Sequence, residues 1–460
     1  MPTASRAEPP PILVSPSAAD QPASAPAAST AADSTSPASP SAAPADPDWP
    51  DLRQRTFDEV WTTVNESYFD PTFGGVDWDA VRAKYAAQLP AIADKAALCD
   101  LLRAMLGELR RTHFSILPRE AAVFTPAERS RIGTIGADFT AVDGQVIVRH
   151  VRPASPAAAA GIHPGDVVLK TNTADLATLA TTLAHYGLTP TQQGSYLVYF
   201  VTSWSRAAVG TALTATVASP DAAPRELTVT CAAHDGEWSE PVGSFPAQPL
   251  EFEAHRDDTG LAYLRLNVFA PSLMRPLRAF VRQLHPGDGL ILDLRANPGG
   301  LTAMAPGIVG LLSDHQVSLG RMILRAGEIG FEAFPQSRAF LGPVAVLIDG
   351  GSASTSEILA AGLQATHRAR LFGEPSAGAA LPSSFKTLPT GDLFQYAIAD
   401  VQTPTHHSLE GRGVAPDIVV ATTRADLAAG RDPVLETARA WLHEARNPPA
   451  PVSAATAPAP

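Results

Sequence analysis

The chain has 460 residues, with 46 acidic and 34 basic side chains and a formal net charge of −12. That length allows two to four domains, and the acidic balance argues against nucleic acid as the main partner, because phosphate binding needs a basic surface. No apolar run approaches the ~20 residues that a membrane-spanning helix requires. The only cysteines, Cys99 and Cys231, lie in no metal-ligand cluster, so we expect neither a zinc site nor a disulfide framework, but two small core residues.

Both ends of the chain have a low-complexity composition. Of the first 48 residues, 34 are Ala, Pro or Ser, which is too little apolar surface to offset the entropy of ordering. We therefore predict disordered segments over residues 1–49 and 448–460. The first segment has no basic region followed by an apolar run, so it is not a signal peptide as written. It is equally consistent with a stalk left after a signal was removed, or with a start codon placed wrongly.

The first periodic sequence predicts a helical subdomain over residues 50–125. Apolar side chains recur at intervals of three and four residues in three short stretches, which is the pattern of amphipathic helices. The apolar positions of the three stretches are Phe57, Val60, Trp61, Val64 and Tyr68, then Trp78, Val81, Tyr85 and Leu89, then Leu98, Leu101, Leu102, Met105 and Leu109.

Residues 131–235 change period, and we interpret them as a compact β-rich module. A short alanine-rich helix ends at Gly161, a Pro-Gly-Asp turn follows, and an apolar strand begins after it. The stretch 179–206 is long for one helix, so we expect the module to contain extra residues there. The aromatic side chains of this stretch could cover a groove or pack inside, and we favour packing inside for all four: Tyr196, Tyr199, Phe200 and Trp204.

Residues 240–425 alternate between short apolar runs and helical stretches. The runs at 261–266, 289–294 and 344–348 are continuous, as buried strands require. Helical stretches separate them, so this part predicts a sheet with crossover helices. A C-terminal helix is predicted over residues 426–447.

A serine-rich turn follows the strand at 344–348. Small residues there allow a sharp turn into a helix, whose first amides are unpaired and point outward. A serine at such a turn has its hydroxyl beside ready-made donors, as in a nucleophile elbow. The same cluster is also an ordinary helix N-cap, since Ser and Thr are preferred there.

Three further segments carry chemical groups but are weak signals individually. The glycine-rich turn at 292–300 has amides that could stabilise an oxyanion, or could merely turn the chain. A lone histidine such as His113 is more often structural than catalytic. A glutamate between a leucine and a glycine, such as Glu410, is usually a solvated loop residue.

In combination these segments are more specific. The motifs Asp-Leu-Arg-x-Asn-x-Gly-Gly, Gly-Ser-Ala-Ser-x-Ser-Glu-Ile, Gly-Glu-Pro and Gly-Val-x-Pro-Asp follow one another in that order. The series resembles the C-terminal processing (tail-specific) serine peptidase family over roughly residues 50–425. The resemblance implies an α+β multidomain fold: an N-terminal helical subdomain at 50–125, a PDZ-like β-rich domain at 131–235, and an α/β (crotonase-like ββα) catalytic core at 240–425.

The resemblance also implies the nucleophile. In the family it is the serine two residues before the Ser-Glu pair, which is Ser354, while Ser352 and Ser356 are the alternatives. An oxyanion hole would combine the amide of Thr355 with that of Gly299 or Gly300.

One departure from the family pattern concerns the base. The best-known branch uses a lysine after Gly-Glu-Pro, and this chain has Ala379 at that position; Lys386, seven residues on, would need a rebuilt loop. The sequence looks instead like the tricorn core protease branch, which uses a histidine preceded by a hydroxyl residue and oriented by a glutamate. The matching residues are Thr112, His113 and Glu410, with His406 and His407 as alternative bases.

These resemblances imply a serine endopeptidase that needs no metal or organic cofactor. Its partner would be the C-terminal tail of a polypeptide, and relatives are usually periplasmic or secreted, although no export signal is written here. The alternatives are an inactive protein of the same fold that binds peptides or apolar ligands, and an esterase; oligomeric state stays open. The PDZ loop expected to bind the tail carboxylate contains Ile135, Gly136, Ala137, Asp138 and Phe139.

Overall fold

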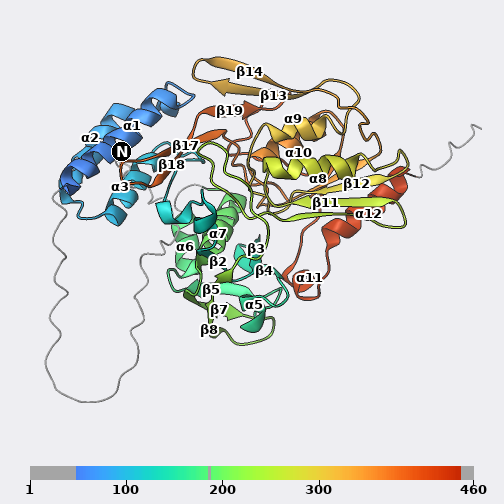
Figure 1. Cartoon of the computed structure of the whole chain (residues 1–460), viewed down its shortest axis with the longest axis horizontal. Helices are drawn as coiled ribbons and strands as arrows, with labels where there is room; N and C mark the ends of the chain where they lie inside the picture. Colours follow the sequence, from blue (N-terminus) through green and yellow to red (C-terminus); the bar gives the residue numbers. More distant parts are fainter. Residues whose placement is uncertain (1–47, 185–187, 447–460) are drawn as a thin grey trace, which may run out of the picture. The chain divides into compact units, whose positions relative to one another are not determined.

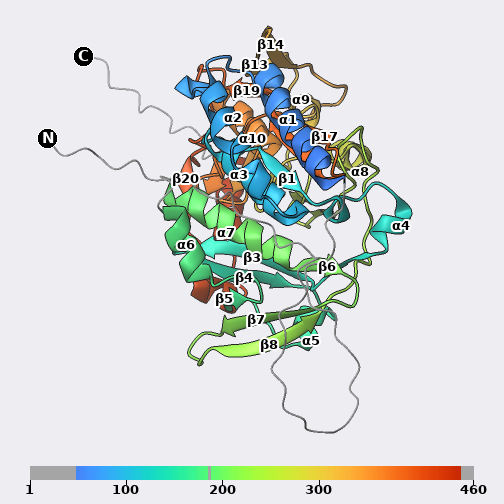
Figure 2. The same ribbon diagram turned by 90° about the vertical axis from the view of Figure 1, so that its left-hand side faces the viewer.

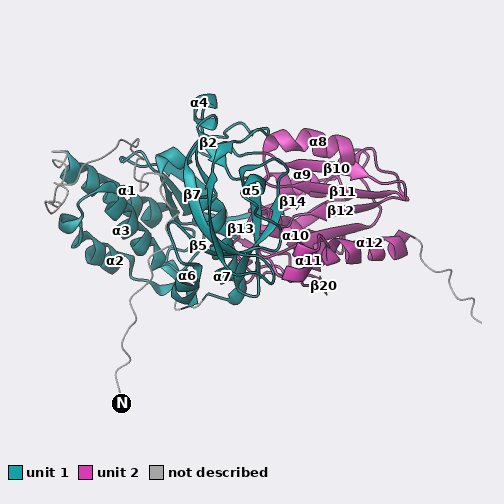
Figure 3. Cartoon of the chain, turned by 90° about the horizontal axis from the view of Figure 1, so that it is seen from below, with its two compact units in different colours: residues 1–249, 322–329, 381–400 teal, residues 250–321, 330–380, 401–460 magenta. Residues whose placement is uncertain are grey.

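The structure is a computed structural model that describes residues 48–184 and 188–446. The predicted disordered segments fall outside the described residues except at their boundary, where the first helix already begins at Trp49. The chain divides into two compact units, coloured separately in Figure 3. Within the described residues, unit 1 contains 48–249, 322–329 and 381–400, and unit 2 contains 250–321, 330–380 and 401–446.

Unit 1 begins with the predicted helical subdomain. The helices pack around a core that includes Phe57, Leu102 and Met105, all fully buried. Asp77 and Asp94 cap the second and third helices, each accepting a hydrogen bond from an amide in the first turn at 2.9 Å. The helices are α1 (Trp49–Ser67), α2 (Trp78–Ala86) and α3 (Lys95–Gly107).

A hairpin from much later in the chain completes this core. Strands β17 (Ser383–Thr387) and β18 (Leu393–Ala397) pair with β1 (Ser115–Leu117) in an antiparallel sheet. The carboxylate of Asp392 is 1% exposed and accepts hydrogen bonds from Lys95 Nζ at 2.8 Å and the Arg119 amide at 3.2 Å. This buried carboxylate therefore ties the hairpin to the helical subdomain.

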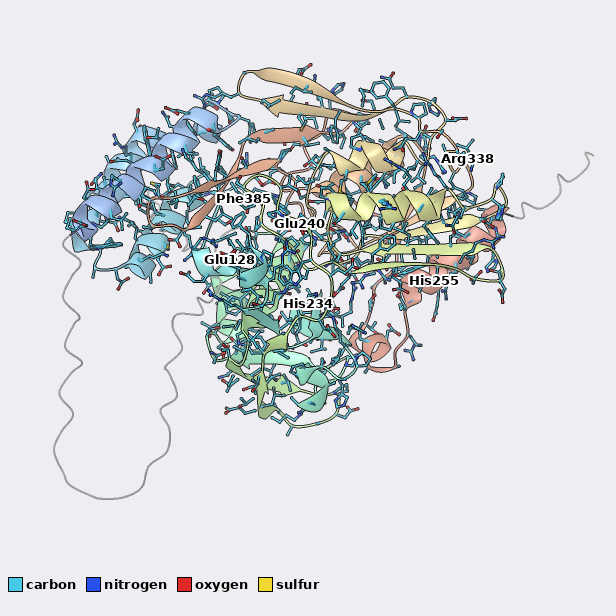
Figure 4. The ribbon with its side chains drawn as sticks, in the orientation of Figure 1. Glu128, His234, Glu240, His255, Arg338 and Phe385 are labelled. Atoms are coloured by element: carbon cyan, nitrogen blue, oxygen red, sulfur yellow. The ribbon has the colours of Figure 1, made fainter. Side chains whose placement is uncertain are left out.

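A linker segment also reaches that hairpin. Ser244 Oγ donates to the Phe385 carbonyl at 2.8 Å, and the ring of Phe385, labelled in Figure 4, meets the ring of Phe245 edge-on at 5.7 Å. Residues 240–249 of unit 1 thus pack on β17.

The β-rich module forms the rest of unit 1. Its five-stranded antiparallel sheet has the order β3-β4-β5-β7-β8, and its core includes Phe139, Val148 and Trp204. Short strands β2 (Ile132–Thr134), β6 (Arg206–Ala208) and β9 (Ala232–Ala233) form a second small sheet. The other elements are β3 (Ala137–Val142), β4 (Gln145–Val151), α5 (Pro156–Ala159), β5 (Val167–Thr171), α6 (Leu176–Ala184), α7 (Pro190–Trp204), β7 (Ala212–Ala218) and β8 (Arg225–Thr230).

The long stretch at 179–206 contains the end of α6 and the whole of α7. Of its aromatic residues, Phe200 and Trp204 are buried and Tyr196 is half-buried against the core. Tyr199 is 53% exposed, so the expectation that all four pack inside is wrong for this residue. Its position on α7 faces away from the sheet, whereas Phe200 and Trp204 lie four residues apart on the buried face.

Unit 2 is built on a six-stranded sheet in the order β10-β11-β12-β15-β16-β20. All neighbours from β11 onward are parallel, and β10 is an antiparallel edge. Every residue of β12 and of β15 is buried, as the continuous apolar runs predict. The strands are β10 (Phe252–Arg256), β11 (Leu261–Leu266), β12 (Gly289–Asp293), β15 (Val344–Ile348), β16 (Arg370–Gly373) and β20 (Ile418–Val419).

Helices cover both faces of this sheet. In Figure 1, α8 (Pro271–Val281), α9 (Met304–Val309) and α10 (Thr355–Ala365) lie on one side and α12 (Pro433–Arg446) on the other. Because β12 and β15 are adjacent and parallel, the turns that follow them emerge side by side at one edge of the sheet. These are the glycine-rich turn and the serine-rich turn singled out in the sequence.

The predicted C-terminal helix over 426–447 is two helices. Gly430, at φ 66°, follows α11 (Arg424–Ala428), and Pro433 begins α12. The chain passes between the units within β13 (Val317–Leu324), β14 (Gly327–Ala333) and β19 (Ala399–Gln402). No helix among the described residues combines the length and apolar character needed to cross a bilayer.

Candidate active site

Ser354 occupies a strained turn between β15 and α10. Its backbone has φ 55° and ψ −116°, a conformation that a residue with a Cβ atom adopts only when its surroundings hold it there. The residue is 9% exposed and immediately precedes the first turn of α10. A strand, a strained serine and a helix N-terminus are the parts of a nucleophile elbow.

The glycine-rich turn after β12 lies directly against this serine. A Cβ atom at Gly299 would lie 2.6 Å from Ser354 Cβ and 3.1 Å from the Thr355 amide nitrogen, and Gly299 has φ +104°. Only glycine satisfies both the close approach and the backbone conformation. A Cβ atom at Gly300 would lie 2.5 Å from the Phe269 carbonyl oxygen. The two glycines therefore allow the turn to fit between Phe269 and Ser354.

The backbone amides of Gly299, Gly300 and Thr355 differ in whether they already donate a hydrogen bond. Gly299 N donates to Asn297 Oδ1 at 2.9 Å, so it is already used. The amides of Gly300 and Thr355 donate to no acceptor within residues 48–184 and 188–446. Thr355 Oγ1 donates to the Gly300 carbonyl at 3.0 Å and holds the two turns together. Of the three amides that the sequence singles out, those of Gly300 and Thr355 are therefore available to a ligand, whereas that of Gly299 is engaged.

The neighbouring serines have their hydroxyls engaged with the backbone. Ser352 Oγ donates to the Leu294 carbonyl at 2.8 Å, and Ser356 Oγ donates to the Asn297 carbonyl at 2.9 Å. Both side chains are fully buried. They join the turn after β15 to the turn after β12, which favours Ser354 over them as the nucleophile.

Glu357 is a functional candidate that the sequence reasoning missed. Its carboxylate is fully buried and accepts four hydrogen bonds, from the amides of Ser354 (3.0 Å), Gly378 (2.8 Å) and Ala379 (2.9 Å) and from Ser376 Oγ (2.6 Å). Burial raises the pKa of this carboxyl to about 7, against the lowering effect of the four donors. The signal in the sequence was the glutamate of the Ser-Glu-Ile motif, three residues after Ser354.

The loop that carries the lysine in the best-known family branch also touches the serine. The Ser354 amide donates to the Ala379 carbonyl at 2.8 Å. One residue further on, the Ala380 amide donates to Glu410 Oε2 at 3.1 Å. Glu410 is half-buried, and the structure places it beside the residue that follows Ala379.

The alternative bases have other surroundings. Lys386 lies on β17 in unit 1 and its ammonium is paired with Glu59 on α1. His406 and His407 are exposed residues of a loop.

His113 and Thr112 follow α3 in unit 1. Thr112 Oγ1 and His113 Nδ1 lie 2.8 Å apart, and the His113 backbone has φ 62°. The imidazole is half-buried, and desolvation lowers its pKa to about 4. Ser354 and Glu410 belong to unit 2.

Two amides of the predicted carboxylate-binding loop are already paired. Ile135 N donates to the Ser205 carbonyl at 3.1 Å, and Gly136 N donates to Thr134 Oγ1 at 3.1 Å. Ala137, Asp138 and Phe139 begin β3 and pair with β4. The loop is therefore closed on its own module.

Neither a metal cluster nor a disulfide is found in the part of the chain that the structure describes. No group of three or more His, Cys, Asp or Glu side chains there could hold an ion. Cys99 and Cys231 are free and buried, as core residues.

Three family models match the chain in the order of these structural parts. The Tricorn protease C1 domain matches residues 50–107, the PDZ domain matches 133–194, and peptidase family S41 matches 260–420. A carboxyl-terminal-processing protease of Synechocystis sp. is 27% identical over 373 residues, 80% of this chain and 81% of the relative. Chloroplastic carboxyl-terminal-processing peptidase 3 of Arabidopsis thaliana is 27% identical over 384 residues, 81% of this chain and 70% of the relative.

Solved structures share the fold. The photosystem II D1 C-terminal processing protease superimposes with a TM-score of 0.56 at 23% identity, covering 80% of this chain and 93% of that one. Mature CPAF gives 0.58 at 14% identity, covering 86% and 97%.

The helical region, the PDZ domain and the core with its elbow serine define a serine-type peptidase. Residues 260–420 match peptidase family S41, and the two relatives are named a carboxyl-terminal-processing protease and a carboxyl-terminal-processing peptidase. The family and fold expected from the ordered motifs are thus confirmed.

Proposed function

We propose that this chain is an endopeptidase in which Ser354 is the nucleophile, His113 the base and Glu410 the group that orients the base through Thr112. The observation that carries the proposal is the position of Ser354: a strained elbow beside the unpaired amides of Gly300 and Thr355. A seryl hydroxyl is a weak nucleophile at neutral pH and needs such a partner base. The proposal requires a hydrogen bond from Ser354 Oγ to His113 Nε2, for which the two atoms must lie ~2.6–3.2 Å apart.

The reaction proceeds in two halves. Ser354 Oγ attacks the scissile carbonyl carbon while His113 Nε2 takes the hydroxyl proton, and the carbonyl oxygen becomes an oxyanion. The C–N bond then breaks, the imidazolium returns the proton to the leaving amine, and an acyl-enzyme remains. Water, deprotonated by His113, cleaves the acyl ester, releasing the new C-terminal carboxylate and restoring the Ser354 hydroxyl.

The amides of Gly300 and Thr355 would receive the oxyanion. Both are fixed before substrate arrives, because the Thr355 hydroxyl binds the Gly300 carbonyl. One such donor typically stabilises the transition state by ~3–4 kcal/mol.

The Thr112 contact supports a particular imidazole tautomer. The 2.8 Å distance between Thr112 Oγ1 and His113 Nδ1 fits a bond in which Nδ1–H donates, which leaves Nε2 as the acceptor that a base requires. The proposal then requires the Thr112 hydroxyl to donate its own proton to a carboxylate, and it gives this role to Glu410. A pKa of His113 lowered to about 4 keeps the imidazole neutral at pH 7.

Recognition of a substrate tail by the PDZ domain is the second part of the proposal. PDZ domains bind C-terminal tails by adding them as a strand beside the sheet. The domain match and the names of the relatives support this assignment.

The test is labelling by a fluorophosphonate probe together with cleavage of an unfolded protein substrate. The wild-type chain should label and cleave, Ser354→Ala should do neither, and Ser352→Ala should keep a labelled Ser354. A folded wild-type chain that never labels would refute the nucleophile and favour a ligand-binding protein. Labelling with turnover of short esters but not of peptides would favour an esterase.

A further inference from the structure

The two edges of the PDZ sheet differ in how far they are covered. β3 is one edge and β8 is the other. On β8, the side chains of one face, Glu226, Thr228 and Thr230, are exposed. None of the six residues of β3 is exposed. The edge that follows the carboxylate-binding loop, where a tail would be added, is therefore covered by another part of the chain.

The cover is helix α7. Its buried residues Leu197, Phe200, Val201 and Trp204 share one core with Ala137 and Phe139 of β3. Figures 1 and 2 both show α7 running beside β3. Trp204 Nε1 also donates to Asn172 Oδ1 at 2.7 Å, which anchors the end of the helix.

Two small residues bring the helix backbone against the strand. A Cβ atom at Gly194 of α7 would lie 2.8 Å from the Cβ atom of Ala141 on β3. An added strand lies ~4.8 Å from its neighbour and needs room for its side chains. At the Gly194–Ala141 contact there is no such room, because the helix and the strand already touch.

The end of the same helix holds one amide of the carboxylate-binding loop, and β2 holds another. The amide of Ile135 donates to the carbonyl of Ser205, the residue that ends α7, and the Gly136 amide donates to Thr134 Oγ1. A tail carboxylate would have to replace both acceptors. Helix α7 thus packs against β3 and also engages the Ile135 amide of the loop.

We propose that α7 is an internal occupant of the peptide groove, held by the Gly194–Ala141 contact, and that a polypeptide tail binds only when α7 moves away from β3. This inference rests on the tail recognition proposed above, and it adds that the position of α7 regulates tail binding. We call the state in which α7 has moved away from β3 the open state. The apparent dissociation constant of a tail is its intrinsic value divided by the fraction of molecules in the open state. A tail that binds the open state would in turn keep α7 displaced.

A reversible cross-link tests the proposal without using peptidase activity. In the full-length double variant Ala141→Cys with Gly194→Cys, the two Cβ atoms are close enough for a disulfide after a small shift, since disulfides hold Cβ atoms ~3.5–4.5 Å apart. The probe is a pool of biotinylated decapeptides with a free carboxylate and four randomised C-terminal positions. We expect the reduced protein to capture at least tenfold more peptide than the oxidised protein, and an amidated pool to show no capture.

Control variants distinguish the effect of the Gly194–Ala141 contact from general effects of cysteine substitution and of the reductant. Each single cysteine variant should capture the same amount with and without reductant, with Cys99 and Cys231 present throughout. Gly194→Ala, which adds a methyl group against Ala141, should capture more peptide than wild type, whereas Tyr199→Ala, exposed on the same helix, should not change capture.

Several results would overturn the proposal. The first is a folded double variant that does not cross-link. The second is equal peptide capture by its oxidised and reduced forms, which includes no capture by either form. The third is capture by Gly194→Ala that is unchanged from wild type or weaker. Because capture needs no catalysis, loss of Ser354 reactivity would refute the proposed peptidase mechanism and leave this result standing.

Discussion

The carboxylate of Glu357 accepts a hydrogen bond from the amide of Ser354 at 3.0 Å, beneath the strained serine. With three further donors from residues 376–379, it fixes the elbow and the adjoining loop together. Glu357→Gln places an amide NH₂ group against backbone N–H donors. We expect kcat to fall roughly ten- to hundredfold, equivalent to about 1–3 kcal/mol, with little change in KM.

Steady-state kinetics and the rate of fluorophosphonate labelling measure this effect. Glu226→Gln, the same change at an exposed position on β8, should leave both unchanged. Wild-type rates in a folded Glu357→Gln protein would show that the carboxylate does not position Ser354.

Gly299→Ala should abolish activity while the protein still folds. The new methyl group would meet Ser354 Cβ at 2.6 Å, and alanine is strained at φ +104°. Gly430→Ala is the matched control, since Gly430 also has a positive φ but open space around it. We expect at least a hundredfold loss of labelling rate for Gly299→Ala and none for Gly430→Ala; equal effects would mean that backbone strain alone is responsible.

We predict that the Thr112 hydroxyl supports catalysis because its oxygen accepts a hydrogen bond from His113 Nδ1. Thr112→Val keeps the shape and removes the partner of His113 Nδ1, so the imidazole loses its preferred tautomer. Thr112→Ser keeps the hydroxyl. We expect Thr112→Val to lower kcat roughly tenfold or more and Thr112→Ser to retain most of it. Equal rates for Ser and Val variants would remove Thr112 from the mechanism.

The pH dependence follows from the lowered pKa of His113. Burial holds this pKa at about 4 in the folded chain, below the ~6.5 of an exposed imidazole. The base should therefore stay neutral down to about pH 4, and the acid limb of the labelling rate should lie near that value. An acid limb at pH 6–7 would contradict this assignment.

The same shift has a consequence for stability. Between about pH 6.5 and pH 4 the unfolded chain binds a proton at His113 that the folded chain does not, so this residue's contribution to the free energy of unfolding decreases as pH falls through that range. His113→Gln should reduce the slope of stability against pH there. Denaturant unfolding at several pH values measures it, and an unchanged slope would speak against a depressed pKa.

Asp392→Asn should destabilise unit 1. The buried carboxylate binds Lys95 Nζ, the Arg119 amide and Thr390 Oγ1, and the amide leaves part of this set without an acceptor. We expect a loss of about 2 kcal/mol in the free energy of unfolding. The exposed Asp51–Arg55 pair supplies the control, because Asp51→Asn should cost less than ~1 kcal/mol. A loss no greater than that of Asp51→Asn would show that Asp392 does not anchor the hairpin.

Much of the fold could be predicted from local patterns. Burial could be predicted directly from the apolar patterns. Apolar residues recur at helical spacing from Phe57 to Leu109, because each helix buries one face. They are continuous in β12 and β15, because both faces of these strands are buried. Residues 424–446 form two helices where the sequence predicts one, because Gly430 at φ 66° lies between α11 and α12.

The residues of the candidate site could be predicted from the sequence, but the separate role of each one could not. The ordered motifs indicated the serine and the two glycines, yet the choice between the amides of Gly299 and Gly300 depends on the Asn297 side chain, which only folded coordinates place. The role of Glu357 could not be predicted from local sequence, because three of its four donors lie 19 to 22 residues further along the chain.

The sequence by itself determined the family, the order of the domains and the absence of a lysine at Ala379, because these are properties of residue identity and spacing. The tertiary structure decided which amides are unpaired, which serine hydroxyls bond to backbone carbonyls, and that Gly194 of α7 lies against Ala141 of β3. These depend on contacts between residues distant in sequence, since hydrogen bonding and close packing arise only where the fold brings separate segments together.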